Sequence, residues 1–492
     1  MIEPLKKIIH SLSKREINYF IKFSRISKNS TSSNYIKLFN DILASGNINV
    51  NKEKGNSKKK NNINIAFEKG RLFEKLLLSI SNFNFEKDNT WKILKKILFI
   101  KVLIEKGVTS KATKMIEEAK KVAYHFEEYD LLLYIISLEE TLCFKHCFIE
   151  CYSKLKELQE ERKRIAEIID FLNYLLMIKA ELQQFQCEDK YYASNLDDFI
   201  KEYGHSPIIQ EQDLKQDLKS VKVKSAIIYL RATCFYIQHD YPNSFLAVKE
   251  HYELFKKFPY FFSREEYIQL TSNLLYCCCL VNEEETFHKL MKEFVNLKNQ
   301  TDEEHIFIMK LYYARTLDLY HRIGKFQEAA HLSLETENFL DTTKSISEPY
   351  HNRYIHVYIV RAYINNKNYS AALHSLNKYF RLTGVEHCIT LFKLFEFIIH
   401  YKLENFDTLI YSINSWIKTI RNKRKQFPVE KVLIYFFRSI YNSVTFEQKK
   451  ELLFNVTKQL KELEQNEFKT YLSYYFDFAG WFENELNEVI NK

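Results

Sequence analysis

Two short stretches of the sequence share one spacing of residues, and this repetition constrains the fold more than any other feature. Residues 320–335 read YHRIGKFQEAAHLSLE, and residues 363–378 read YINNKNYSAALHSLNK. In both stretches a tyrosine is followed by an aromatic residue six positions later, an alanine nine positions later and a histidine eleven positions later. The copies are 43 residues apart, a period typical of stacked helical hairpins.

The repeat predicts hairpins that consist of a first helix A, a short turn and a second helix B. In the first copy, helix A is expected to end near Tyr320, the turn to lie at Gly324–Lys325 and helix B to begin at Phe326. Ala329 is then expected on the inner face of helix B, where a small side chain allows close packing, and Phe326 is expected to fill the corner of the hairpin. An earlier hairpin is expected at residues 92–126. Looser copies place the start of helix B at Tyr241, Glu284, Phe326, Tyr369 and Phe406, with spacings of 43, 42, 43 and 37.

The two best copies, YHRIGKFQEAA and YINNKNYSAAL, resemble tetratricopeptide (TPR) repeats. The helix-A aromatic, turn aromatic and small helix-B residue of that family match Tyr320, Phe326 and Ala329 in one copy and Tyr363, Tyr369 and Ala372 in the other. Its turn glycine matches Gly324, whereas Lys367 departs from it. The N-terminal segment LSKREINYFIKFSR…NYIKLFNDIL resembles the opening of a group of uncharacterised bacterial TPR-type proteins. The resemblance covers about residues 90–420 and implies an all-α, right-handed superhelical solenoid of TPR-like hairpins, but no activity.

The scarcity of glycine and proline agrees with a helical fold. The 492 residues include only 8 Gly and 6 Pro, well below average usage. Tight turns with positive φ and phosphate-binding loops both favour glycine, so sheet-rich folds and glycine-rich nucleotide sites are disfavoured. Five stretches fit the Ser/Thr-x-x-Glu/Gln capping box that begins a helix. They are Ser13–Glu16, Ser263–Glu266, Thr301–Glu304, Ser345–Glu348 and Thr445–Gln448.

The chain divides into three expected parts. Residues 1–88 form a basic helical module that contains a mobile loop at 45–64, residues 89–425 form the solenoid, and residues 426–492 form capping helices. Over residues 1–110 there are 22 Lys and Arg against 9 Asp and Glu, whereas the rest of the chain has a net charge of −4. The run of Lys52, Lys54, Lys58, Lys59 and Lys60 is a possible contact for a polyanion such as nucleic acid. A solvated loop is the preferred interpretation, because no aromatic platform or Arg fork accompanies the run.

The sequence favours a cytoplasmic protein. No apolar run approaches the length needed to span a bilayer, and the N-terminus lacks the apolar core of a signal peptide. The 9 cysteines are an odd number without the spacing of a disulfide framework, so reduced thiols are expected.

The cysteines give two candidate sites for chemistry. Cys143, Cys147 and Cys151, with His146 between them, are four residues apart and would lie along one helix face. Core packing is the preferred interpretation, with zinc binding and redox chemistry as alternatives. Cys277–Cys279 are consecutive and point in different directions on a helix, so a buried helix is expected there.

No motif in the sequence indicates an enzyme. His331 and His374 occupy equivalent positions in adjacent copies, too far apart to bind one metal, and are interpreted as packing or surface residues. Nucleophile-elbow, dinucleotide and phosphate-loop patterns are absent from the sequence. We therefore expect no catalytic residue, no metal and no cofactor.

The function that best fits a hairpin array is binding of a partner protein. The A helices of such an array line a concave face that accepts peptides or helices of a partner. The TPR resemblance implies Asp318, His321, Arg361 and Asn365 as groove residues for a partner of unknown identity. A nucleic-acid-associated regulator that uses the basic N-terminal region is the alternative, and no membrane association is expected.

Overall fold

The computed structural model describes most of the chain, and every regular element in the described residues is helical. The described residues are 2–26, 34–44, 62–85, 89–145, 148–187, 203, 220–298, 302–343, 354–380, 386–421, 427–441, 445–465 and 475–491. The all-α prediction is thus confirmed. None of the helices in these ranges has the length and apolar character of a membrane span.

The chain has two compact units, Met1–Leu172 and Asn173–Lys492. The boundary falls inside one long helix, α8 (Phe148–Cys187). The repeats and the charge distribution of the sequence did not predict this boundary. The division of the chain into three parts stays a prediction.

The first unit contains eight helices in the described residues, counting the first part of α8, and its first four surround a small core. Their bounds are α1 (Ile2–Ser11), α2 (Lys14–Ile26), α3 (Asn34–Ala44) and α4 (Asn62–Asn84). Leu5, Phe20, Phe39 and Leu76 are buried in this core. Helix α4 begins inside the range expected to be a loop, so residues 62–64 are helical. The five lysines of the basic run lie outside the described residues.

The other helices of the first unit are α5 (Asn89–Glu105), α6 (Thr109–His125), α7 (Tyr129–Phe144) and α8. Helices α5 and α6 form the expected early hairpin, with the turn at 106–108. Gly107 in this turn has a φ of 72°, a conformation that glycine adopts without the steric cost of a Cβ atom.

The second unit is a succession of helical hairpins. Its first helices, here called A helices, are α10 (Val221–Ile237), α12 (Arg264–Val281), α14 (Asp302–Arg322), α16 (Tyr354–Asn365), α18 (Glu386–Lys402) and α20 (Pro428–Tyr441). Its B helices are α11 (Tyr241–Lys257), α13 (Glu284–Val295), α15 (Phe326–Thr342), α17 (Tyr369–Tyr379), α19 (Phe406–Arg421) and α21 (Phe446–Gln465). The short 3-10 helix η3 (Pro259–Phe261) follows α11, and the C-terminal helix α23 (Phe478–Ile490) follows α21.

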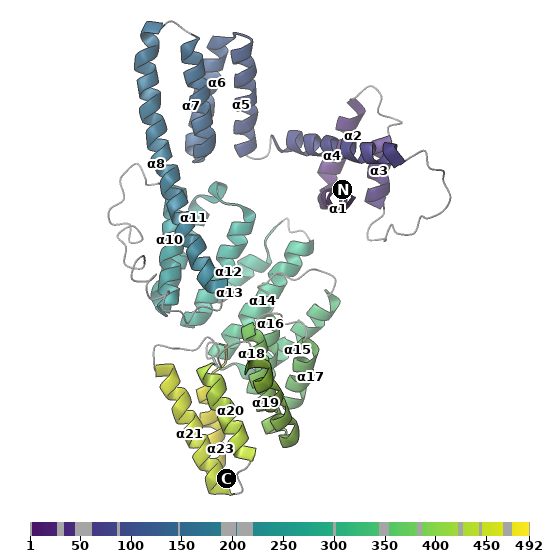
Figure 1. The fold of residues 1–492 in the computed structure, drawn as a ribbon, viewed down its shortest axis with the longest axis vertical. Coiled ribbons are helices and arrows are strands. Elements are labelled where there is room, and N and C mark those ends of the chain that lie inside the picture. Colours follow the sequence, from purple (N-terminus) through teal and green to yellow (C-terminus); the bar gives the residue numbers. More distant parts are fainter. Residues whose placement is uncertain are drawn as a thin grey trace. The chain divides into compact units, whose positions relative to one another are not determined.

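Each hairpin packs on the next in the same way. From α12 to α20, every A helix contacts the following A helix, and every B helix from α11 to α19 contacts the A helix after it. The succession from α12 to α17 can be followed in Figure 1. Because an isolated hairpin cannot bury its apolar side, this stacking produces an extended core. One core cluster reaches from Ala232 to Leu319, and another reaches from Ala314 to Phe482.

The turns confirm the repeat found in the sequence. Each A helix from α10 to α18 is followed by a residue with a left-handed backbone: His239, Asn282, Gly324, Lys367 and Glu404, with φ between 57° and 76°. Their spacings are 43, 42, 43 and 37. The backbone N–H of the residue after each left-handed residue donates a hydrogen bond to the carbonyl five residues earlier. Examples are Lys325 to Tyr320 (2.8 Å) and Asn368 to Tyr363 (2.9 Å). This is the Schellman motif, which satisfies carbonyls at the end of a helix.

Local sequence signals explain where several helices begin. In a capping box, each of two residues donates its backbone N–H to the side chain of the other. The structure shows both hydrogen bonds in the pairs Ser13 and Glu16, Ser263 and Glu266, and Thr445 and Gln448. Three of the five predicted capping boxes are therefore confirmed. Thr301, Ser345 and Glu348, from the other two, lie outside the described residues.

Packing within the hairpins agrees with the prediction for the alanine of helix B but not for the aromatic residue at the turn. Ala329 and Ala372 are completely buried, as expected. Phe326 is 39% exposed, so the prediction that it fills the corner of its hairpin is wrong. The side chain stands beside the turn instead, on the rim of a surface pocket described below.

The left-handed turns give a test of the repeat. Gly324→Ala should lower the free energy of unfolding by about 1 kcal/mol, because the non-glycine side chain is strained at this φ. A Cβ atom there would meet nothing within 4 Å, so only the backbone opposes the change. Glu404→Gly should raise the free energy of unfolding by a similar amount, and thermal unfolding measures both.

Glu404→Ala is the matched control, because it removes the carboxylate and keeps the strained backbone. It should change stability by less than about 0.5 kcal/mol. Opposite signs for Gly324→Ala and Glu404→Gly support the turn geometry, and shifts of the same sign would contradict it.

Candidate functional site

The four residues predicted to line a partner groove lie together on α14 and α16, but three of them are buried. Asp318, His321 and Arg361 are 0%, 4% and 7% exposed, and Asn365 is half-buried. Their side chains contact one another across the two A helices. Their role in binding a partner stays a prediction, while the structure shows a role in joining adjacent hairpins.

Asp318 is the acceptor at the centre of this group. Its Oδ1 accepts a hydrogen bond from Nε of Arg322 (3.1 Å) and lies 3.6 Å from Nη1 of Arg361. Burial lowers the pKa of Arg361 to about 10, although the Asp318 carboxylate opposes this shift. A buried charge is costly unless it is paired, so the Asp318 carboxylate holds the Arg361 guanidinium inside the array.

His321 adds an uncharged hydrogen-bonded bridge beside the ion pairs. Its Nε2 is 3.2 Å from the carbonyl oxygen of Tyr358, and its Nδ1 is 3.3 Å from Nδ2 of Asn365. A neutral ring with its proton on Nε2 satisfies both contacts, since it donates to the carbonyl and accepts from the amide. Burial, reinforced by the charge of Arg361, holds the pKa of His321 well below its usual value.

Further residues continue this polar group along the A helices. The hydroxyl groups of Tyr236 on α10 and Tyr276 on α12 are 3.2 Å apart. The Arg315 guanidinium carbon on α14 is 4.4 Å from the centre of the Tyr276 ring, and Arg315 interacts electrostatically with Tyr358 on α16. We call the side of the A helices that carries Tyr236, Tyr276, Arg315 and Tyr358 the A-helix face. Tyr236, Tyr276 and Arg315 are partly exposed.

The C-terminal segment covers the A-helix face beyond Tyr358. The Tyr475 ring stacks on Tyr354 with centroids 5.0 Å apart and lies 6.2 Å from the Tyr358 ring. Farther along, Phe476 contacts Phe395 on α18 at 5.2 Å. The charge of Asp477, like that of Asp318, opposes the lowering of the Arg361 pKa by burial.

Helix α23 itself continues across the next two A helices. The Trp481 ring is 6.4 Å from Tyr401 on α18, and the Phe482 ring is 4.8 Å from Phe436 on α20. Phe478 and Phe482 are almost fully buried. The segment from Tyr475 to the end of α23 therefore contacts α16, α18 and α20 through these side chains, while α23 itself packs most extensively on the B helix α21.

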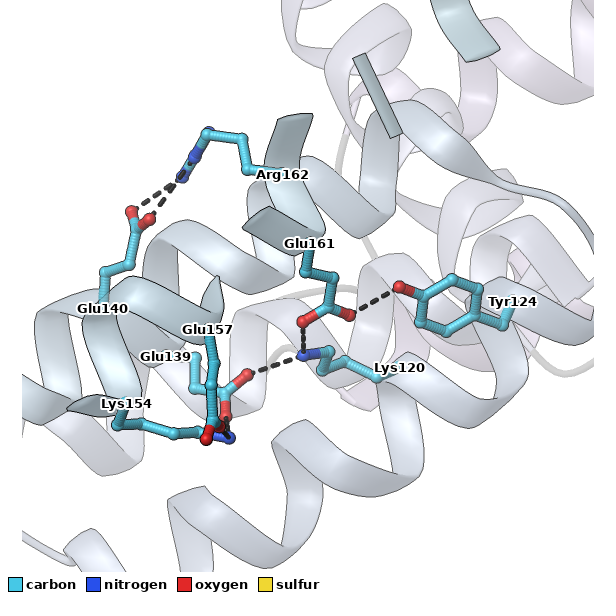
Figure 2. A network of polar contacts seen from close by, with 8 residues as sticks. All are labelled: Lys120, Tyr124, Glu139, Glu140, Lys154, Glu157, Glu161 and Arg162. Atoms are coloured by element: carbon cyan, nitrogen blue, oxygen red, sulfur yellow. Dashed lines mark hydrogen bonds and ion pairs between the residues drawn. The ribbon is translucent and has the colours of Figure 1, made fainter. Parts of the chain in front are cut away.

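A second polar network, in the first unit, ties α6, α7 and α8 together (Figure 2). Lys120 Nζ lies 2.9 Å from Glu139 and 2.6 Å from Glu161, and the Tyr124 hydroxyl donates to Glu161 at 2.5 Å. Burial and the bond to Glu161 raise the pKa of Tyr124. Arg162 pairs with Glu140 (2.7 Å), and Lys154 pairs with Glu139 (3.4 Å) and Glu157 (3.7 Å). Because every carboxylate here already has a protein partner, we interpret the network as structural.

The cysteine candidates do not form one helix face. Helix α7 ends at Phe144 and α8 begins at Phe148, so Cys143 and Cys151 lie on different helices. Cys147 and His146 lie outside the described residues. The prediction of three sulfurs along one helix is thus wrong, because the chain turns between the first and the third. Among the described residues, no group of three His, Cys, Asp or Glu side chains could hold a metal ion.

The remaining sequence candidates are accounted for. Cys277–Cys279 are buried in α12, as predicted. The side chains of His331 and His374 are exposed on α15 and α17, and His331 lies 3.4 Å from Glu335. Exposure and separate helices agree with a surface role for both histidines.

One surface pocket, of about 410 Å³, lies between consecutive turns. Its lining includes Phe326 and Glu328 from α15 and Asn365 and Lys367 from the end of α16 and its turn. Asn365 thus joins this pocket to the His321 bridge. The pocket borders the group of predicted groove residues on the side of the hairpin turns.

No protein-family model matches the chain, and no curated protein shows significant similarity. The tetratricopeptide resemblance and the likeness to bacterial TPR-type proteins stay predictions.

Sequence reasoning missed Tyr236, Tyr276, Arg315 and the covering segment. The residues before and in α23 read YYFDFAGWF, and this density of aromatic residues was the available signal. It does not reveal which distant helices the segment covers, because the contacts link residues about 80 to 120 positions apart.

The His321 bridge predicts a stability that depends on pH. His321 stays neutral when folded but protonates near pH 6.5 when unfolded. Its contribution to stability is therefore complete above about pH 6.5 and is lost as the pH falls below that value. His251, whose pKa burial lowers to about 4, acts in the same direction.

His321→Gln should reduce the loss of thermal stability between pH 7 and pH 5, because glutamine has no proton to gain. His331→Gln, at an exposed histidine, is the control and should leave the pH dependence unchanged. An unchanged slope in His321→Gln would contradict a neutral buried His321.

The Asp318–Arg361 ion pair predicts that reversing the charge of Arg361 destabilises the folded chain. Arg361→Glu places a second carboxylate beside Asp318 and should lower the free energy of unfolding by about 3–5 kcal/mol. Arg361→Met should cost less, because Arg322 remains to pair with Asp318. Chemical denaturation measures both; native stability in Arg361→Glu would show instead that the side chain reaches solvent.

Proposed function

We propose that this protein is a non-catalytic, cytoplasmic protein-interaction scaffold. In this proposal the hairpins from α10 to α21 form a right-handed superhelical, TPR-like solenoid that binds a peptide or helix of a partner on the A-helix face. The observation that carries the proposal is that the array already holds one helix there, its own α23.

The part of the A-helix face on α10, α12 and α14 has the composition of a protein-binding surface. Tyrosine and arginine dominate energetic hot spots, because they combine apolar area with hydrogen bonding. Tyr236, Tyr276 and Arg315 supply these groups on three consecutive A helices and remain partly exposed. They are held in place by one another, so a partner would meet an ordered surface.

The experiment compares capture of partners by the wild-type chain with capture by face variants. Tagged protein is recovered from its host with and without nuclease, and co-purified proteins are quantified by mass spectrometry. Tyr276→Ala and Arg315→Ala should each reduce a nuclease-resistant partner at least about tenfold, which corresponds to about 1.4 kcal/mol. Circular dichroism and thermal unfolding check that the variants remain folded.

Tyr411→Ala is the matched control, because Tyr411 is 77% exposed on the B helix α19. It should leave capture unchanged. Partners lost equally in all three variants, or retained in all three, would contradict binding on the A-helix face. Partners that disappear with nuclease would favour the nucleic-acid alternative.

A further inference from the structure

The segment that covers the A-helix face meets it with charged groups as well as aromatic ones. Glu485 on α23 lies 2.7 Å from Lys402 at the end of α18, and Glu488 lies 3.7 Å from the same Nζ. Glu488 also pairs with Lys367, the left-handed residue between α16 and α17. The acidic end of α23 thus lies at the turns that end two consecutive A helices.

The two ends of the segment from Tyr475 to the end of α23 make different kinds of contact, aromatic at the start and ionic at the end. Aromatic contacts run from Tyr475 at α16 to Phe482 at α20, where side chains are buried. The ion pairs follow toward the end of α23: the Lys402–Glu485 pair is largely buried, whereas the Lys367–Glu488 pair lies at the rim, where the Lys367 side chain is 68% exposed. A buried aromatic centre with a charged rim is the anatomy of an interface between proteins.

This polarity fixes the direction in which a helix can lie. The lysines stand at the turn end of the A helices, whereas Tyr354 and Tyr358 lie in the first half of α16. A helix bound in the reverse direction would place its acidic residues among the tyrosines and leave both lysines unpaired. The face therefore selects a helix that is aromatic in its N-terminal part and acidic toward its C-terminus.

We propose that the part of the A-helix face on α16, α18 and α20 is a helix-binding site. Its ligand in a partner protein is an amphipathic helix with the aromatic-then-acidic order of residues 475–490, and this helix exchanges with α23. The inference rests on the proposed function and adds to it the class of partner segment and the competitor within the chain.

Competition follows from the covalent connection between α21 and α23. A tethered segment has an effective concentration in the millimolar range. A partner helix must therefore bind more tightly than α23 or be tethered itself through contacts elsewhere on the A-helix face. Tyr276 and Arg315 lie where such additional contacts would form, next to the covered part.

The test uses the full chain with a protease recognition sequence placed within residues 466–474. After cleavage, native mass spectrometry and gel filtration determine whether the C-terminal fragment stays bound. A fluorescent synthetic peptide of residues 475–491 is then added to cleaved and to uncleaved protein, and fluorescence anisotropy measures its binding.

The expected result is that the fragment remains bound after cleavage and that the peptide replaces it. Binding to uncleaved protein should be weaker by at least about tenfold, because the tethered helix competes. A peptide with Glu485→Lys and Glu488→Lys should bind at least about tenfold more weakly, since the three ion pairs of these carboxylates with Lys367 and Lys402 are lost. A peptide with Asn484→Ala, which keeps the aromatic and acidic residues, is the matched control.

Three outcomes would overturn the inference. They are aggregation of the cleaved chain, a fragment that never exchanges, and equal binding of the wild-type and charge-reversed peptides. The first two would make α23 a permanent part of the core, and the third would remove the acidic end from recognition. None of them bears on capture of partners through Tyr276 and Arg315, so failure here is distinguishable from failure of the proposed function.

Discussion

The second unit depends on one backbone constraint, the left-handed residue that ends each A helix from α10 to α18. It reverses the chain within three residues, and the Schellman bond that follows fixes where the B helix begins. Because the turns recur at nearly constant spacing, equivalent residues of successive A helices come side by side. The A-helix face exists because this register is kept from one hairpin to the next.

Register explains why a repeat can carry different side chains at one position. Asp318 and Arg361 are equivalent residues, 43 positions apart, and they form an ion pair across α14 and α16. Arg315 and Tyr358 are likewise equivalent and interact. Identical charges at positions 318 and 361 would repel, so the acid on α14 and the base on α16 match these two hairpins to each other. A buried pair of this kind contributes specificity of packing more than net stability.

The sequence predicted the local features and missed those that depend on distant contacts. Hairpin turns, capping boxes and the buried Ala329 were predictable, because each is determined within a few residues. The burial of Arg361 was not predictable, because a repeat pattern assigns a face to the groove without showing what covers that face. The turn between Cys143 and Cys151 was missed for another reason: a regular spacing of cysteines agrees with a continuous helix and does not require one.

The covering helix also shows how stability and recognition overlap in an array of repeats. The last hairpin of such an array has no neighbour, so its apolar side must be covered by a cap. Helix α23 covers it with aromatic side chains, yet the segment from Tyr475 to the end of α23 also contacts α16, through Tyr475, and α18, through Trp481. Covering the end of the array requires contact with the last hairpin alone. The additional contacts at Tyr354, Lys367 and Lys402 lie on hairpins that already have neighbours on both sides, and they are the reason to regard this surface as a binding site.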